Sequence, residues 1–215
     1  LVNEICKLAL VHLIAFVSLW VQVDGLIGPH GILPAGPFLA AVHQQLGAAA
    51  YWQLPTVCWW IGTGAALHVL CGIGVIAALA LFAGIAPAPM LGVLWLAYLS
   101  LCGVGQVFFN FQWDALLIEA TFLAVWIAPW SLLPLWSRPR PPRLARWLIV
   151  WLLFRLMFLS GAVKLSSGDP NWAHLTALSF HFETQPLPTP LAWSAHQLPP
   201  WLLRASCALM FVIEL

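Results

Sequence analysis

Polar side chains that could carry chemistry are concentrated in three short segments of an otherwise apolar chain. In the first, Gln106, Asn110 and Asp114 recur every four residues, so a helix here would place all three on one face. Thr121 continues nearly in line. Glu119 lies within the apolar run that follows, where an ionisable group is usually either paired or functional. We consider two alternatives for this face, a polar seam that joins helices and a direct role in binding or chemistry.

Ionisable side chains in other apolar stretches offer partners for Glu119. Arg155 and Lys164 are nine residues apart, which at 100° per residue places them on opposite faces of one helix. Arg155 lies about half-way along its stretch, and we predict a buried pair with Glu119 that fixes helix register. Lys164 lies at the outer end, where it either reaches toward the interface or acts as a base. We interpret His68 as a hydrogen-bonded residue between helices rather than a proton carrier.

The third polar segment contains a turn and a group of potential ligands. Residues 168–170 read Gly-Asp-Pro, a turn in which Asp169 is well placed to accept backbone N–H groups. His174 and His181 are seven residues apart, on one helical face, and Glu183 follows. A metal site favours more ligands at tighter spacing, and the cysteines lie elsewhere. We therefore expect a hydrogen-bonded structural cluster, with no metal and no cofactor.

The composition decides where these segments lie. Of 215 residues, 62% are hydrophobic and 7% are charged, whereas about a quarter of an ordinary soluble domain is charged. Residues 25–113 contain no Asp, Glu, Lys or Arg. These numbers exclude a water-soluble enzyme, a secreted disulfide scaffold and a disordered linker, and they indicate a multi-pass membrane protein. The net charge of +1 gives no bulk attraction to nucleic acid, and the five cysteines, without a CxxC motif, are typical of small packing residues.

The elements that must position the polar segments are membrane-spanning helices, each of which needs about 20 mostly apolar residues. We predict an all-α fold, a polytopic transmembrane helix bundle of five to six spans with extracytoplasmic loops. Because the last apolar run is cut off, we interpret residues 1–215 as a single transmembrane domain truncated at its C-terminus. The expected spans are residues 5–23, 57–84, 90–107, 115–133, 144–165 and 201–215.

The orientation follows from the basic residues, half of which crowd one short loop. This loop, between the fourth and fifth spans, carries Arg138, Arg140, Arg143 and Arg146. The positive-inside rule places it in the cytoplasm, together with the amino terminus. Segments 24–56, 106–114 and 166–200 then face the opposite side, and we expect them to form one composite extracytoplasmic surface.

Several longer motifs resemble the lipase maturation factor family. Residues 105–119 contain Gly-Gln, then Phe-Gln-Trp-Asp and a glutamate, which resembles the family block GQ-F-x-F-QWD-x-LLLE. Residues 153–165 resemble the block LLFRLMF-x-SG-x-VKL. The blocks at 168–188 and 196–199 and the start at 26–35 are also similar to the family. The resemblance covers nearly the whole chain, with the motifs in the family's order.

This resemblance implies a membrane-embedded, chaperone-like maturation factor that assists the folding, assembly or export of secreted lipases. The family's vertebrate members are multi-pass proteins of the endoplasmic reticulum, thought to be chaperone-like or redox-linked, with no well-established catalytic residues. The implied partners are a secreted lipase client and membrane lipid. The resemblance also implies that the protein is not an enzyme. The location is the endoplasmic reticulum membrane in a eukaryote or the cytoplasmic membrane in a bacterium, and the Ala-, Trp- and Pro-heavy composition favours a bacterium.

The candidate binding residues lie on two outward-facing segments that also carry the strongest family blocks. They are Trp113, Asp114, Asp169, Trp172, His181, Glu183 and Gln185.

A second, fainter resemblance supplies an alternative function. Residues 161–172 are similar to a segment of the vitamin K-dependent γ-carboxylases and their bacterial membrane relatives, in which a lysine acts as a base during quinone oxidation. The alternative is therefore a membrane oxidoreductase or carboxylase-like enzyme that uses Lys164 as a base on a quinone-type substrate. This chain lacks the second lysine of that motif and has a Ser-Ser-Gly insertion before Asp169, which favours the maturation factor.

Overall fold

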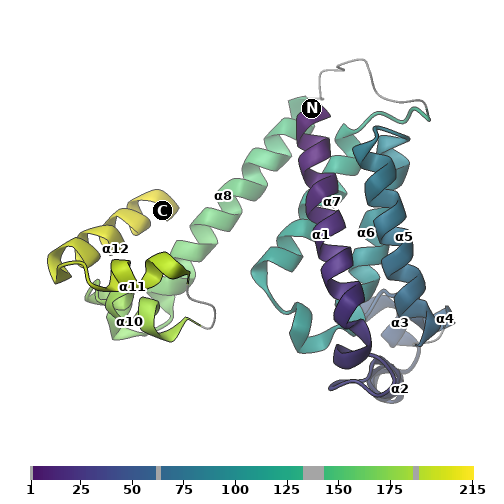
Figure 1. Ribbon diagram of the computed structural model, residues 1–215, viewed down its shortest axis with the longest axis horizontal. Helices are drawn as coiled ribbons and strands as arrows, with labels where there is room; N and C mark the ends of the chain where they lie inside the picture. Colours follow the sequence, from purple (N-terminus) through teal and green to yellow (C-terminus); the bar gives the residue numbers. More distant parts are fainter. Residues whose placement is uncertain (1, 62–63, 133–142, 186–188) are drawn as a thin grey trace. The chain divides into compact units, whose positions relative to one another are not determined.

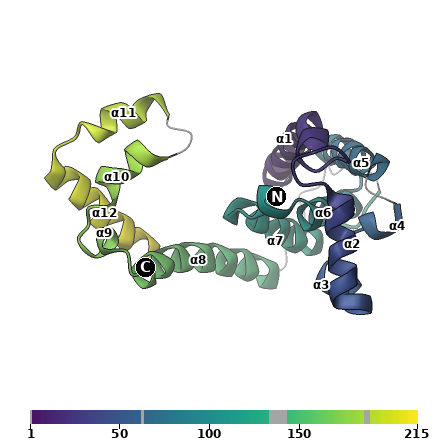
Figure 2. The ribbon, with the colours of Figure 1, turned by 90° about the horizontal axis from the view of Figure 1, so that it is seen from below.

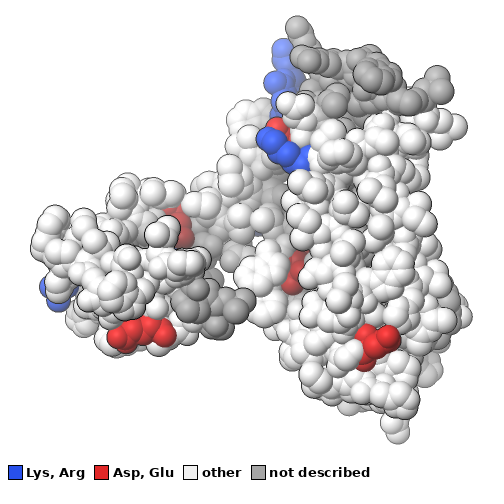
Figure 3. Space-filling view, viewed as in Figure 1, with Lys and Arg blue, Asp and Glu red and all other residues white. Residues whose placement is uncertain are grey.

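The computed structural model describes residues 2–61, 64–132, 143–185 and 189–215, and every regular element in these ranges is helical. The predicted all-α fold is confirmed. The chain divides into two compact units, Leu1–Leu148 and Ile149–Leu215, which we describe separately. Charged atoms are few on the face shown in Figure 3, as expected for a protein surrounded by lipid.

Four helices of the first unit run side by side (Figure 1). Neighbours along the chain are also neighbours in space: the first long helix packs on the second, the second on the third, and the third on the fourth. They are α1 (Val2–Leu26), α5 (Ala65–Phe82), α6 (Pro87–Val104) and α7 (Gln112–Ile127).

Short helices gather at the end of this bundle where α1 ends. Helix α2 (Ala35–Leu46) runs crosswise to α1. It is seen end-on in Figure 1 and lengthwise in Figure 2. The others are η1 (Gly47–Ala49), α3 (Ala50–Gln53), α4 (Cys58–Ile61) and η2 (Gln106–Phe109). The side-chain amide of Gln106 donates to the carbonyl of Leu33 at 3.1 Å. Segments 24–56 and 106–114 therefore meet at one end of the bundle.

Close packing in the first unit depends on a small residue opposite a large one. The ring of Phe16 in α1 is fully buried, with an edge-to-face contact to Tyr98 in α6. Gly74 in α5 leaves the space that this ring fills, since a Cβ built on Gly74 would overlap it. The two helices thus approach each other because one of them lacks a side chain at this point.

The turn between α5 and α6 reverses the chain within a few residues. Gly84 and Ala86 have positive φ angles of 76° and 43°, and Pro87 begins α6. Left-handed backbone is easy for glycine and costs an alanine about 1–2 kcal/mol. Proline suits the first helical position because it lacks an N–H that would have no partner there.

The second unit contains α8 from Ile149 onward and the four helices that follow it. Helix α12 returns to α8, where the Lys164 ammonium lies 2.7 Å from both carboxylate oxygens of Glu214. Gly161 allows this approach, because a Cβ there would crowd the side chain of Leu215. The helices are α8 (Arg143–Ser166), α9 (Pro170–Ala173), α10 (Ala177–Thr184), α11 (Pro190–His196) and α12 (Pro200–Glu214).

Helix lengths differ from the expected spans in several places. Among the described residues, four helices are long and apolar enough to cross a membrane: α1, α5, α6 and α8. Within the expected span 57–84, α4 covers Cys58–Ile61, and the long helix begins only at Ala65, after the N-cap residue Gly64. Helices α7 and α12, at the places expected for the fourth and sixth spans, have 16 and 15 residues. Residue 133, the last of the expected span 115–133, lies outside the described residues. Arg138 and Arg140 of the loop that follows also lie outside them.

Candidate functional site

A groove opens between α1 on one side and the η2–α7 segment on the other, with α6 behind it. We call it the α1–α7 groove; its volume is about 430 Å³. Two of the candidate binding residues, Trp113 and Asp114, line it. The full lining is Val11, Ile14, Ala15, Ser18, Leu19, Gln22, Leu26, Tyr98, Phe108, Phe109, Phe111, Trp113, Asp114 and Leu117.

Trp113 and Asp114 face different surroundings although they are adjacent. The Trp113 side chain is 63% exposed, and its indole stacks on the ring of Phe111 with centroids 4.6 Å apart. Asp114 is only 6% exposed and accepts a hydrogen bond of 2.6 Å from the hydroxyl of Tyr98. The carboxylate lies in the first turn of α7, where the helix dipole favours negative charge.

A second polar contact joins α1 to α7 deeper in the bundle. His12 Nε2 lies 2.7 Å from Thr121 Oγ1, and both residues are fully buried. The single hydroxyl hydrogen of Thr121 is donated to the carbonyl of Leu117 at 2.6 Å. His12 must therefore donate from Nε2 to the Thr121 oxygen. This contact is a polar seam between helices, one of the two alternatives considered for this part of α7.

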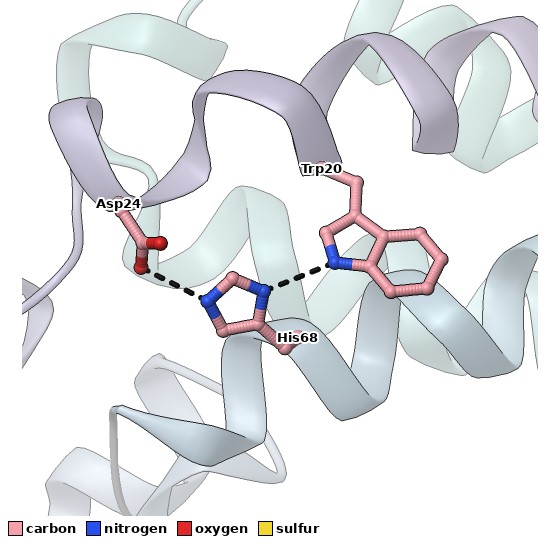
Figure 4. A network of polar contacts seen from close by, with 3 residues as sticks. All are labelled: Trp20, Asp24 and His68. Carbon is pink, nitrogen blue, oxygen red and sulfur yellow. Dashed lines mark hydrogen bonds and ion pairs between the residues drawn. The ribbon is translucent and has the colours of Figure 1, made fainter.

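A three-residue network joins α1 to α5 near the C-terminal end of α1 (Figure 4). The indole N–H of Trp20 donates to His68 Nδ1 at 3.0 Å, and His68 Nε2 lies 3.0 Å from Asp24 Oδ1. Because Nδ1 accepts, Nε2 carries the proton and donates it to the carboxylate. The interpretation of His68 as a hydrogen-bonded interhelical residue is confirmed.

The continuous polar face expected at 106–114 is not formed. Gln106 has a positive φ of 51° and begins η2, which ends at Phe109. Phe111 is extended, and α7 begins only at Gln112. The prediction that Gln106, Asn110 and Asp114 share one helix face is wrong. Gln106 lies in η2 and Asp114 in α7, and the chain between these two helices is not helical.

The shared face predicted for His174 and His181 is also wrong. Leu175, between them, has a positive φ of 58°, so His174 follows α9 and His181 lies in α10. The carboxylate of Glu183 pairs instead with His196 Nε2 of α11 at 3.0 Å. Within the described ranges, no three His, Cys, Asp or Glu side chains converge in a way that could hold a metal ion.

The remaining candidate residues of the second unit make contacts within that unit. Asp169 caps α9 by accepting the backbone N–H of Asn171 at 2.9 Å. Trp172 packs edge-to-face on Phe211 of α12, with ring centroids 6.1 Å apart. His181 is exposed, and Gln185 ends α10 with a backbone bond to the His181 carbonyl. The part of this block at 186–188 lies outside the described residues.

Lys164, the base of the alternative enzyme, is the centre of a small cluster. Its ammonium pairs with Glu214, and the two side chains are 24% and 14% exposed. It also lies 5.7 Å from the centroid of the Trp172 ring, a cation–π distance. These contacts give Lys164 a structural role in holding α8, α9 and α12 together.

The structure assigns Glu119 to α7 in the first unit and Arg155 to α8 in the second. Their pairing stays a prediction. The same division separates Trp113 and Asp114 from the candidate residues of the second unit.

The five cysteines, all within the described residues, are free thiols. Burial raises the pKa of the Cys58 thiol, next to α5, and so favours its protonated, unreactive form. Cys58, Cys71 and Cys207 are buried, which agrees with the packing role expected from the sequence, whereas Cys6 and Cys102 are partly exposed.

Comparison with known proteins decides the family. The profile of the Lipase maturation factor transmembrane domain matches residues 4–215. The chain belongs to this family. It is an integral membrane protein of the lipase maturation factor family, which confirms the resemblance seen in its motifs.

Named relatives agree with the profile. The chain is 46% identical to Lipase maturation factor 2 of Rattus norvegicus, over 96% of the chain and 32% of that protein. It is also 46% identical to Lipase maturation factor 2 of Homo sapiens, over 96% and 31%. Identity to Lipase maturation factor 1 of Homo sapiens is 35%, over 97% and 38%. The chain thus spans about a third of the length of these relatives. No solved structure matches it.

These lipase maturation factors are vertebrate proteins, and they give no support to the bacterial source expected from the composition. They also give no support to the alternative enzyme that acts on a quinone.

The sequence alone did not single out His12 and Tyr98. His12 holds α7 to α1 through Thr121, and Tyr98 holds α7 to α6 through Asp114. Each is a lone polar side chain within an apolar run, and that isolation was the available signal.

Proposed function

We propose that this chain is the membrane domain of a maturation factor that assists the folding, assembly or export of secreted lipases. It acts as a chaperone-like protein and not as an enzyme, in the endoplasmic reticulum membrane. The observation that carries the proposal is the family match over residues 4–215, together with relatives named lipase maturation factors that share up to 46% identity with the chain.

The client contacts the extracytoplasmic side. Segments 24–56 and 106–114 lie at one end of the first unit, joined by the Gln106–Leu33 hydrogen bond, as a shared extracytoplasmic surface requires. The proposed contact residues are those of the two outward segments: Trp113, Asp114, Asp169, Trp172, His181, Glu183 and Gln185. Of these, the exposed indole of Trp113 is best placed for direct contact in the first unit, since Asp114 is buried.

The test is a cell line that lacks the full-length protein and secretes a homodimeric lipase. Lipase activity in the medium is compared with lipase protein in the medium and in the cells. We expect inactive, retained or aggregated lipase in the deleted line, and recovery when the full-length protein is restored. A secreted protein unrelated to lipases serves as the control and should be unaffected.

Complementation with Lys164→Ala separates the maturation factor from the enzyme. Because Lys164 holds Glu214 and Trp172 in place, we expect at most a partial loss of lipase maturation. Lys164→Arg keeps the positive charge and should recover part of that loss. Complete loss of maturation by a Lys164→Ala protein that is inserted and folded normally would contradict the proposal and support the enzyme.

A further inference from the structure

We propose that the α1–α7 groove binds a lipid with one alkyl chain and an uncharged, hydroxyl-bearing head, the chemistry of a monoacylglycerol. The proposal concerns a ligand of the membrane domain and goes beyond the proposed function. It does not depend on the identity of the client.

The size and the walls of the groove suit an alkyl chain. Its volume of about 430 Å³ lies within the range of about 300–1,000 Å³ that is common for ligand sites. The α1 wall extends from Val11 to Leu26, which at the helical rise per residue is about 22 Å. Most of the lining side chains are aliphatic or aromatic, so an alkyl chain bound here contacts apolar surface along its length.

The polar atoms of the groove suit hydroxyl groups. An ionised carboxylate has about four acceptor sites, and the Tyr98 hydroxyl occupies one of those on Asp114. Because the single Tyr98 hydrogen is used in this bond, the Tyr98 oxygen can only accept a further hydrogen bond. Ser18 and Gln22, which line the opposite wall, both donate and accept. A head with two hydroxyls can donate to Asp114 and also satisfy side chains of this kind.

The charge of the groove argues against anionic lipids. Asp114 is the one acidic residue among the described residues that line it, and none of them is Lys, Arg or His. A phosphate or a carboxylate placed here would meet a buried like charge without a counterion. A phosphocholine head would gain contacts for its cation but would still leave its phosphate without a cationic partner.

The experiment uses the full-length protein in nanodiscs and three photoreactive probes with the same alkyl chain. The probes are a monoacylglycerol, the same glycerol lipid with a phosphate, and a lysophosphatidylcholine. Labelled peptides are identified by mass spectrometry. We expect the monoacylglycerol probe to label α1 and residues 108–117, and the phosphate probe to label them weakly.

Two variants and a matched control make the result specific. Ser18→Trp fills the groove and should lose most of the labelling, whereas Val21→Trp, at an exposed position of α1 outside the lining, should keep it. Asp114→Asn keeps an acceptor for Tyr98 but removes the charge. It should therefore raise labelling by the phosphate probe toward that of the monoacylglycerol.

Three outcomes would overturn the proposal. The first is equal labelling of wild type by the monoacylglycerol and phosphate probes. The second is labelling of Ser18→Trp as strong as that of wild type, which would mean that the probe does not bind in the groove. The third is stronger labelling by the phosphocholine probe, which would assign the carboxylate and the aromatic rings to a cation.

Discussion

His12 of α1 and Thr121 of α7 are hydrogen-bonded at 2.7 Å, although 109 residues separate them in the chain. Thr121→Val keeps the shape but leaves the Nε2–H of His12 buried without its acceptor. An unsatisfied buried donor costs about 1–3 kcal/mol, so we expect the free energy of unfolding to fall by about that amount. Denaturant titration in mixed micelles measures it. The matched control is Thr184→Val, at an exposed site where the hydroxyl bonds only to its own helix.

The contact between Phe16 and Gly74 predicts opposite effects of one substitution at two helical glycines. Gly74→Ala should destabilise the protein by about 1–3 kcal/mol, because the added methyl group forces the buried Phe16 ring to move. At Gly92 a Cβ meets nothing within 4 Å. Gly92→Ala should therefore be neutral or stabilising by up to about 1 kcal/mol, the helix propensity gain. Equal effects at both positions in a thermal unfolding assay would contradict the packing described here.

The sequence prediction of a buried pair between Glu119 and Arg155 can be tested by a double-mutant cycle. Removal of one partner of a buried ion pair typically costs about 3–5 kcal/mol, and removal of both costs less than the sum. We expect Glu119→Gln and Arg155→Met to show this non-additive behaviour in unfolding experiments on the full-length protein. Strictly additive effects would mean that the two residues act independently.

Two substitutions separate the structural role of Asp169 from its proposed role in client binding. Asp169→Ala removes the acceptor for the Asn171 N–H and should cost about 1 kcal/mol of stability. Asp169→Asn keeps a capping oxygen and removes the charge, so it should preserve stability but lower the yield of active secreted lipase. Full lipase maturation by Asp169→Asn would limit this residue to its capping role.

The predicted orientation can be checked by cysteine labelling at two serines, Ser137 before the start of α8 and Ser167 directly after its end. In a protein whose native cysteines have been replaced, a membrane-impermeant reagent applied from the extracytoplasmic side should label Ser167→Cys and not Ser137→Cys. The reason is that the positive-inside rule places the Arg-rich loop in the cytoplasm. Ser137 lies outside the described residues, so this measurement rests on the sequence. The reverse labelling pattern would overturn the orientation.

The sequence was sufficient for the fold class, because low charge and long apolar runs leave helices as the natural way to satisfy the backbone in lipid. It was also sufficient for the role of His68, a polar residue that needs a partner within an apolar helix. It could not reveal the breaks at Gln106, Phe111 and Leu175, since these depend on local backbone angles rather than on the hydrophobic pattern. The partner of Asp114 could not be predicted either, because Tyr98 meets it only once α6 and α7 are packed.

The turn between α5 and α6 bears on how the protein is made. Residues 83–86 carry no charge, and neither helix beside them contains Asp, Glu, Lys or Arg. Moving charged side chains into a membrane is the expensive part of insertion, so α5 and α6 can enter the bilayer together as one hairpin. Their direction is then decided by charges elsewhere, at Lys7 and in the arginine-rich loop. During synthesis this hairpin has no topological signal of its own and takes its direction from the segments made before and after it.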